Sequence, residues 1–219
     1  MTTEAPEKSS ERTVVGLAAK EKNGRGGNLT AKGEATKTRL LEVAEEVFGE
    51  VGFDQASVSE ITRRAGVAQG TFYLYFPSKQ AIFSELVREI GRQVRHNTQV
   101  AIEGLTERAD IERKGFEAFF EYVRKHPSIY RIVRQAEFVD REVFAEYYET
   151  FARGYAEGLK NSIGEGDMKD LDPEVIAWCL MGMGDLVGVR WILLRPDGKV
   201  PKKVIDTMVA FIQRGLAED

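Results

Sequence analysis

Hydrophobic side chains recur every three or four residues along most of this chain, the spacing that places them on one face of an α-helix. No stretch of convincing length alternates between hydrophobic and polar residues in the manner of a β-strand. We therefore expect an all-α protein. Longer helices are predicted at about residues 36–51, 78–95, 107–125, 127–138, 140–162, 172–194 and 200–216.

Two short helices joined by a tight turn are predicted after the first long helix. Ser57 is followed three residues later by Glu60, which is the spacing of a capping box at a helix start. Gly66 stands at the expected end of this helix, where glycine tolerates the positive φ of a C-cap. Phe72 and Phe76 lie one turn apart in the second helix and are expected to pack inward. The pattern is typical of a helix-turn-helix, whose second helix fits the major groove of DNA.

Polar residues on the second short helix are expected to point away from this core. Gln69 suits a bidentate contact with a base edge, and Gly70 lets the backbone come close to the DNA. Hydroxyl groups and a cation for contacts with the sugar-phosphate backbone come from Thr71, Tyr73, Tyr75 and Lys79. A single residue of this kind is more often an ordinary surface or core residue, so the prediction rests on the whole set.

The sequence from Gly66 to Lys79, G-V-x-x-G-T-x-Y-x-Y-F-x-S-K, closely resembles the DNA-binding domain of the tetracycline-repressor (TetR) family of transcriptional regulators. The resemblance extends from Thr38 to Leu86. It implies a homodimer that binds double-stranded DNA through the helix-turn-helix and a small-molecule effector through a variable helical domain. The residues implied by position to contact DNA are Lys37, Ser57, Ser59, Gln69, Gly70, Thr71, Tyr73, Tyr75 and Lys79.

One position departs from the family pattern. Ala68 stands where many members have a serine that caps the recognition helix. Because alanine has no side-chain acceptor, we expect the first amide groups of this helix to depend more on DNA for hydrogen-bond partners.

The chain is expected to divide into a disordered arm at residues 1–33, a helix-turn-helix domain at 34–82, and an effector-binding and dimerisation domain at 83–219. The arm is poor in aromatic residues and contains several glycines, which is typical of disorder. Two interpretations of it stay open: an inert tail, or a basic arm that reaches a neighbouring DNA groove. The cations of such an arm are Lys20, Lys22, Arg25 and Lys32.

Three of the predicted helices are assigned roles between domains or subunits. The helix at 78–95 joins the two domains and is the expected lever between them, with a solvated face formed by Arg88, Arg92 and Arg95. The last two helices are the expected homodimer interface, because residues 179–188 are apolar all round and contain glycines that permit close approach. The final helix adds a stripe of Val204, Met208, Phe211 and Ile212. Packing within one subunit is the alternative for both helices.

The segment from Phe116 to Tyr155 is unusually rich in aromatic residues. Core packing explains many of them, but an apolar cavity with a few polar groups is also what a small-molecule effector needs. The residues predicted to bind the effector are Phe116, Phe120, Tyr130, Arg131, Arg134, Phe138, Tyr147, Phe151, Trp178 and Asp185. A surface salt bridge is the alternative for each arginine.

The identity of the effector is inferred from the resemblance. TetR-like proteins with aromatic-rich ligand domains and such arginines include sensors of acyl-CoA thioesters and of hydrophobic drugs. We favour a repressor that is released from a palindromic operator by an acyl-CoA or fatty-acid-like effector. The alternatives are a regulator of efflux that responds to hydrophobic drugs, and a helical DNA-binding module without an effector.

The net charge is −4 at pH 7, which is unusual for a protein that binds nucleic acid. Residues 1–96 contain 14 basic and 13 acidic side chains, so the predicted DNA-binding half is nearly neutral. Affinity for DNA must therefore depend on a few well-placed groups rather than on a broad basic surface.

Other chemistry is not predicted. One cysteine, Cys179, and two histidines, His96 and His126, provide neither a disulfide nor the spacing of a metal site, and no cofactor is expected. No catalytic motif is found, so we do not expect an enzyme. The apolar residues 175–194 include Asp185 and Arg190 and predict a buried helix rather than a membrane span. Without a signal-peptide pattern, a cytoplasmic protein is expected.

Overall fold

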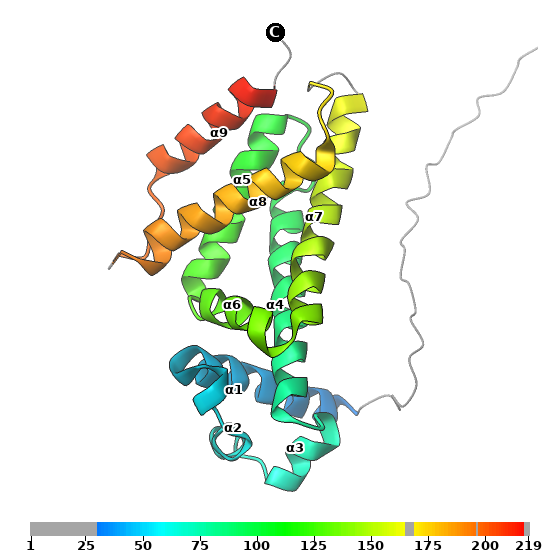
Figure 1. The fold of residues 1–219 in the computed structure, drawn as a ribbon, viewed down its shortest axis with the longest axis vertical. Helices are drawn as coiled ribbons and strands as arrows, with labels where there is room; N and C mark the ends of the chain where they lie inside the picture. Colours follow the sequence, from blue (N-terminus) through cyan, green and yellow to red (C-terminus); the bar gives the residue numbers. More distant parts are fainter. Residues whose placement is uncertain (1–29, 165–168, 196, 217–219) are drawn as a thin grey trace, which may run out of the picture.

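The computed structural model describes residues 30–164, 169–195 and 197–216, and within these ranges the chain forms helices and no strands. The prediction of an all-α fold is confirmed. A helix-turn-helix unit of α1 to α3 lies at one end, and α4 leads from it into a bundle with α5, α6 and α7, which α8 crosses obliquely (Figure 1). The helices are α1 Ala31–Gln55, α2 Val58–Ala65, α3 Gln69–Tyr75, α4 Lys79–Ile102, α5 Arg108–Lys125, α6 Ile129–Val139, α7 Arg141–Gly164, α8 Pro173–Gly188 with its π-helical continuation Val189–Leu193, and α9 Lys202–Leu216.

Two helix boundaries differ from the prediction. α1 begins at Ala31 because Thr30 caps it, its hydroxyl accepting a hydrogen bond from the Gly33 amide at 3.2 Å. The end of the expected disordered arm was therefore placed too late, since residues 31–33 are helical. Residues 1–29, with three of the four cations proposed for the arm, lie outside the described residues. α4 continues to Ile102, beyond the predicted end at 95, and so reaches the far end of the bundle.

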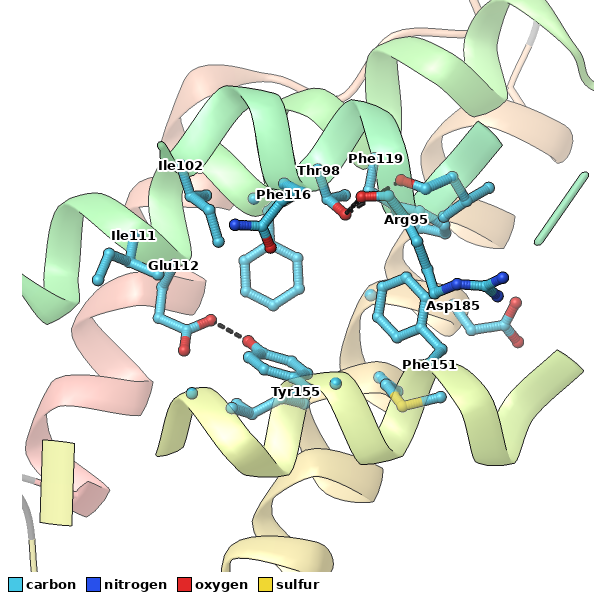
Figure 2. A pocket seen from close by; sticks show the side chains of 18 of the residues that line it. Arg95, Thr98, Ile102, Ile111, Glu112, Phe116, Phe119, Phe151, Tyr155 and Asp185 are labelled. Carbon is cyan, nitrogen blue, oxygen red and sulfur yellow. Dashed lines mark hydrogen bonds between the residues drawn. The ribbon is translucent and has the colours of Figure 1, made fainter. Parts of the chain in front are cut away.

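The bundle has its own core, formed where α5, α7, α8 and α9 meet, and it encloses a cavity (Figure 2). Two glycines of α8 serve this packing: a Cβ at Gly184 would lie 3.2 Å from the Phe116 ring, and one at Gly188 would overlap the Tyr130 hydroxyl. Gly182, by contrast, faces open space. The α8 glycines were predicted to admit a second helix at a dimer interface, but two of them admit aromatic side chains of the same subunit.

The predicted stripe on the final helix also packs mostly inside the subunit. Met208 and Ile212 are 6% and 4% exposed, and Val204 is half-buried against the same core. Only Phe211 of the four points to solvent, at 70% exposure. The alternative of core packing is therefore correct for most of this stripe.

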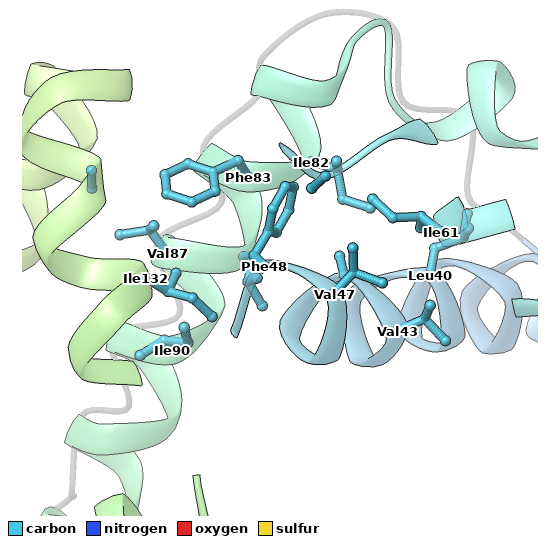
Figure 3. Packing of buried hydrophobic residues seen from close by; sticks show 14 of the residues in the cluster. Leu40, Val43, Val47, Phe48, Ile61, Ile82, Phe83, Val87, Ile90 and Ile132 are labelled. Atoms are coloured by element: carbon cyan, nitrogen blue, oxygen red, sulfur yellow. The ribbon is translucent and has the colours of Figure 1, made fainter. Parts of the chain in front are cut away.

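The helix-turn-helix unit is organised around three phenylalanines, two from α1 and one from α4. Phe48 of α1 and Phe83 of α4 meet edge to face at 5.1 Å between ring centroids, and Phe53 lies against both, at 5.9 and 5.1 Å. Ile61 and Phe72, from α2 and α3, are fully buried in the same cluster. Figure 3 shows that this core continues along α4 to the α6 side of the bundle. The two parts of the chain therefore share a core, and a change in one can be transmitted to the other.

Candidate DNA-binding surface and effector cavity

The turn between α2 and α3 is built as the sequence predicts. The Ser57 hydroxyl accepts a hydrogen bond from the Glu60 amide at 3.1 Å and caps α2. Gly66 ends α2 in the left-handed region, at φ 71° and ψ 30°, where a side chain would cause strain. Ala68 occupies the N-cap position of α3 and makes no side-chain hydrogen bond there. The first amide groups of the recognition helix are therefore left without a side-chain partner, as expected from this residue.

The outer face of α3 presents most of the residues predicted to contact DNA. Gln69 and Gly70 are exposed, Thr71 is half-buried, and Tyr73 is 52% exposed. Tyr75 is different, because it packs partly against the core of the unit. Leu74 is 82% exposed on the same short helix, and sequence analysis missed it. The available signal was its position midway between the buried residues Phe72 and Phe76, which places Leu74 on the other side of the helix.

Lys79, predicted to contact the DNA backbone, makes its contacts within the protein in this structure. Its ammonium group donates hydrogen bonds to the carbonyl oxygens of Phe53 (2.7 Å), Asp54 (3.3 Å) and Ala56 (2.9 Å). It also lies 4.4 Å from the centroid of the Phe53 ring. These partners occupy the ammonium group within the protein, and the phosphate contact stays a prediction. In this conformation Lys79 stabilises the end of α1 and the residue that follows it.

The other cations near this surface are paired with acidic side chains. Lys37 forms an ion pair with Glu85 at 3.2 Å. Arg63 and Arg64 both bind Glu60, and their hydrogen bonds hold the pKa of Glu60 at about 2. The remaining predicted backbone contacts, Ser57 and Ser59, are exposed and uncharged. The surface thus offers mainly hydroxyl and amide groups, in agreement with its nearly neutral charge.

A cavity of about 740 Å³ lies among α4, α5, α6, α7 and α8. Its size is within the range of sites that enclose small ligands, which is about 300–1,000 Å³. Rings and aliphatic groups from α4, α5 and α7 form much of its wall (Figure 2). The predicted effector-binding residues that line it are Phe116, Tyr130, Arg134, Tyr147, Phe151 and Asp185.

Four of the predicted effector-binding residues do not line this cavity. Phe120 is buried in the core, where its ring approaches Gly188 of α8. Arg131 lies on the opposite face of α6 and donates to the carbonyl oxygens of Gly49 (2.6 Å) and Glu50 (2.7 Å). Phe138 is 86% exposed near the end of α6, and Trp178 is 44% exposed and stacks on the outside of Tyr148. The structure does not bring these four residues to the cavity, because the aromatic segment spans helices whose faces point in different directions.

The cavity also contains a polar cluster that sequence analysis missed. Glu112 is only 2% exposed and accepts hydrogen bonds from Arg108 and from the Tyr155 hydroxyl. Figure 2 shows the bond between Glu112 and Tyr155. Burial, followed by the charge of Glu112, raises the pKa of Tyr155 well above its usual value. The Nε of Arg108 is buried and has no hydrogen-bond partner among the described residues. The available signal was the four-residue spacing of Glu112 from both Arg108 and Phe116, which places a carboxylate in line with the aromatic face.

Arg95 is the other cavity residue that was misinterpreted. It was predicted to form a solvated face with Arg88 and Arg92, yet its side chain is half-buried and lines the cavity. Arg88 and Arg92 do lie on the surface side, where they bind Glu146 and Glu89. The difference follows from position, since residue 95 is one turn beyond Gly91 on the face that meets α7.

Comparison with known proteins agrees with this architecture. The sequence model for bacterial regulatory proteins of the tetR family matches residues 40–86, the helix-turn-helix unit. The HTH-type transcriptional regulator YdgC of Bacillus subtilis is 32% identical over 188 residues, covering 83% of this chain and 94% of that protein. EthR of Mycobacterium tuberculosis is 31% identical over 129 residues, which cover 57% of this chain and 59% of EthR.

Solved structures show the same fold. The fatty acid degradation regulator FadR from Bacillus halodurans superposes with a TM-score of 0.71 at 22% identity, covering 81% of this chain and 94% of that one. A candidate fatty acid metabolism regulator from Clostridium perfringens gives 0.67 at 26% identity, with 83% and 100% covered. The fold and the helix-turn-helix define a DNA-binding transcriptional regulator rather than an enzyme. The chain belongs to the tetR family of bacterial regulatory proteins.

The apolar helix near the C-terminus differs from the prediction of a buried helix. Pro173–Leu193 is long and apolar enough to cross a membrane by length and composition, and 33% of its most apolar window is buried. One such helix is weak evidence for a span, since core helices of soluble proteins pass the same test. Cys179 is exposed on it. Across the described ranges, no group of three or more His, Cys, Asp or Glu residues is arranged to hold a metal ion.

Proposed function

We propose that this regulator is a repressor that binds a palindromic operator as a homodimer and is released by a fatty-acid-like or acyl-CoA effector bound in the cavity. The observation that carries the proposal is the cavity itself, because α6, which forms part of its wall, also packs against α1 of the helix-turn-helix unit. Two structures with the same fold come from proteins named as regulators of fatty acid metabolism or degradation. The apolar wall formed by Phe116, Phe119 and Phe151 suits an acyl chain.

The homodimer is supported by apolar side chains that one subunit leaves exposed on α8 and α9. Four of them, Val175, Trp178, Leu186 and Leu193, lie three, eight and seven residues apart along α8 and its continuation, spacings that place them on one side of that helix. The exposed apolar residues are Val175, Trp178, Leu186, Leu193, Leu194 and Phe211. Large apolar side chains left exposed on one side of a helix favour association with a second copy, and two copies place two recognition helices on the two halves of a palindrome.

The coupling mechanism that we propose uses both faces of α6. One face carries Tyr130, Val133 and Arg134 in the cavity wall. The other face binds the end of α1, through Arg131 as described above and through Gln135, whose side-chain oxygen accepts a hydrogen bond from the Phe53 amide at 2.6 Å. An effector that packs against the first face shifts α6 and, with it, the end of α1. The α4 lever predicted from the sequence would act together with α6, since both contribute to the shared core.

The DNA-binding assignment is tested by replacing Gln69 with alanine. We expect the Gln69→Ala variant to lose about 1–2 kcal/mol of operator binding at one base-pair position, because the side chain is exposed at the start of α3 with a free amide. The measurement is a titration of the protein with its own upstream DNA and with single-base variants of the bound site. Gln93→Ala, which removes an exposed glutamine on α4, is the matched control. Equal affinities and equal base preferences for all three proteins would contradict the groove assignment.

The coupling through α6 is tested by replacing Arg131 with alanine. Removing its hydrogen bonds to α1 should reduce the effect of the effector on operator affinity by about 1 kcal/mol, which is within the usual range of coupling free energies. Operator affinity is measured with and without saturating dodecanoate or dodecanoyl-CoA. Arg124→Ala serves as control because Arg124 pairs only with Glu121 on the surface of α5. A full effector response in Arg131→Ala would contradict a role for α6.

A further inference from the structure

Arg95 is held at the cavity wall by its neighbours on α4 and α7. A Cβ at Gly91 would lie 3.0 Å from the Arg95 Nη1 and 3.2 Å from the Tyr147 ring, so the absence of a side chain at Gly91 leaves room for the guanidinium there. Figure 2 shows the side chain extending from α4 on the cavity side. Packing therefore holds the Arg95 side chain in this position, without an ion pair.

The guanidinium group of Arg95 is not neutralised. Among the described residues it makes no hydrogen bond and no ion pair, whereas the other arginines of the cavity are paired, Arg108 with Glu112 and Arg134 with Asp185. Burial is the largest cause that lowers the pKa of Arg95, and the charges of Tyr147 and Glu146 offset only part of this desolvation. Two further acidic residues of the cavity, Glu103 and Glu157, are exposed.

We propose that Arg95 is the anion-binding residue of the cavity and that the effector is an amphipathic carboxylate. The carboxylate accepts hydrogen bonds from the Arg95 guanidinium, and the apolar part lies along Phe116, Phe119 and Phe151. This inference rests on the proposed effector function and narrows it, because it selects a free acid over a neutral lipid, a cationic drug or a thioester.

A cationic effector fits the same cavity less well. The aromatic wall suits a cation, and a protein of the same fold was solved with choline, at 18% identity and a TM-score of 0.70. In this chain, however, the buried acidic group, Glu112, and the half-buried Asp185 are each paired with an arginine. To pair with either of these carboxylates a bound cation would have to displace an arginine, whereas a bound carboxylate would complete the pairing of one.

The test compares ligands that share a chain and differ in the head group. Dodecanoate, dodecanol, dodecyltrimethylammonium and dodecanoyl-CoA are titrated calorimetrically, below their micellar concentrations, into the full-length protein and its Arg95→Gln variant. The wild-type protein should bind dodecanoate at least about tenfold more tightly than dodecanol. Arg95→Gln should weaken dodecanoate binding by about tenfold to a hundredfold and leave dodecanol within about threefold. Arg92→Gln, an exposed neighbour on α4, should change neither, and thermal melting confirms that both variants are folded.

The outcomes separate this inference from the proposed function. If dodecanoate and dodecanol bind the wild-type and Arg95→Gln proteins equally, the cavity is still an effector site and the role of Arg95 is wrong. Preference for dodecyltrimethylammonium, or binding of dodecanoyl-CoA without dodecanoate, would also overturn the inference, since neither head group presents a carboxylate to Arg95. If none of the four ligands binds the wild-type protein, the proposed fatty-acid-like effector itself is wrong.

Discussion

Replacement of Lys79 by methionine is expected to lower the free energy of unfolding by about 3 kcal/mol, because three hydrogen bonds to backbone carbonyls are lost at about 1 kcal/mol each. The carbonyls belong to Phe53 and Asp54 at the end of α1 and to Ala56, which follows it. Methionine keeps most of the aliphatic stem, so the loss is assigned to the ammonium group and its contact with the Phe53 ring. Operator binding should weaken only as far as the folded population falls.

The measurement is denaturant unfolding without DNA, followed by operator titration at a temperature where the variant is folded. Lys37→Met is the matched control for the unfolding measurement, because the ion pair of Lys37 with Glu85 is partly exposed and such pairs contribute about 0–1 kcal/mol to stability. A stable Lys79→Met protein that no longer binds any DNA would show that the ammonium group leaves its carbonyl partners and contacts phosphate instead.

The case of Lys79 shows what sequence patterns can and cannot predict. The caps at Ser57 and Gly66 were predicted because both ends of each interaction lie within a few residues of one another. The partners of Lys79 lie 23 to 26 residues earlier in the chain and are brought near only when α1 and α4 pack together. A cation in a DNA-binding motif therefore looks like a phosphate ligand until the tertiary contacts are known.

The effector cavity shows the same limit of sequence patterns, because they do not predict which face of a helix lines it. On α6, Tyr130 and Arg134 are four residues apart, and so are Arg131 and Gln135. Either pair is a reasonable cavity face by spacing alone. The first pair lines the cavity because the second is turned toward the end of α1, where Arg131 and Gln135 supply hydrogen bonds. The presence of an aromatic-rich cavity was predictable, whereas its wall depended on which helices pack against each other.

Substitution of Gly188 by alanine is expected to destabilise the protein by about 2 kcal/mol, although alanine is the better helix former by about 1 kcal/mol. A methyl group at this position would overlap the Tyr130 hydroxyl and lie 3.1 Å from the ring carbon that bears it. Tyr130 is 4% exposed and is surrounded by core, so the space into which its ring can move is the cavity. Gly154→Ala is the control, since a Cβ there meets nothing within 4 Å and should be neutral or stabilising.

The Tyr130→Phe variant distinguishes two causes of the destabilisation by Gly188→Ala: overlap with the Tyr130 hydroxyl, and the loss of the glycine itself. Alone, it should cost about 1 kcal/mol by removing the hydrogen bond to the Asp185 carbonyl, which is long at 3.3 Å. Combined with Gly188→Ala it removes the overlapping atom, so the double variant should be more stable than Gly188→Ala by about 1 kcal/mol. Dodecanoate affinity should follow the same order, because a displaced Tyr130 ring narrows the cavity and its return restores the space. If Tyr130→Phe does not relieve the destabilisation caused by Gly188→Ala, α8 itself moves instead of the Tyr130 ring. The Gly188→Ala variant would then bind dodecanoate as tightly as the wild-type protein does.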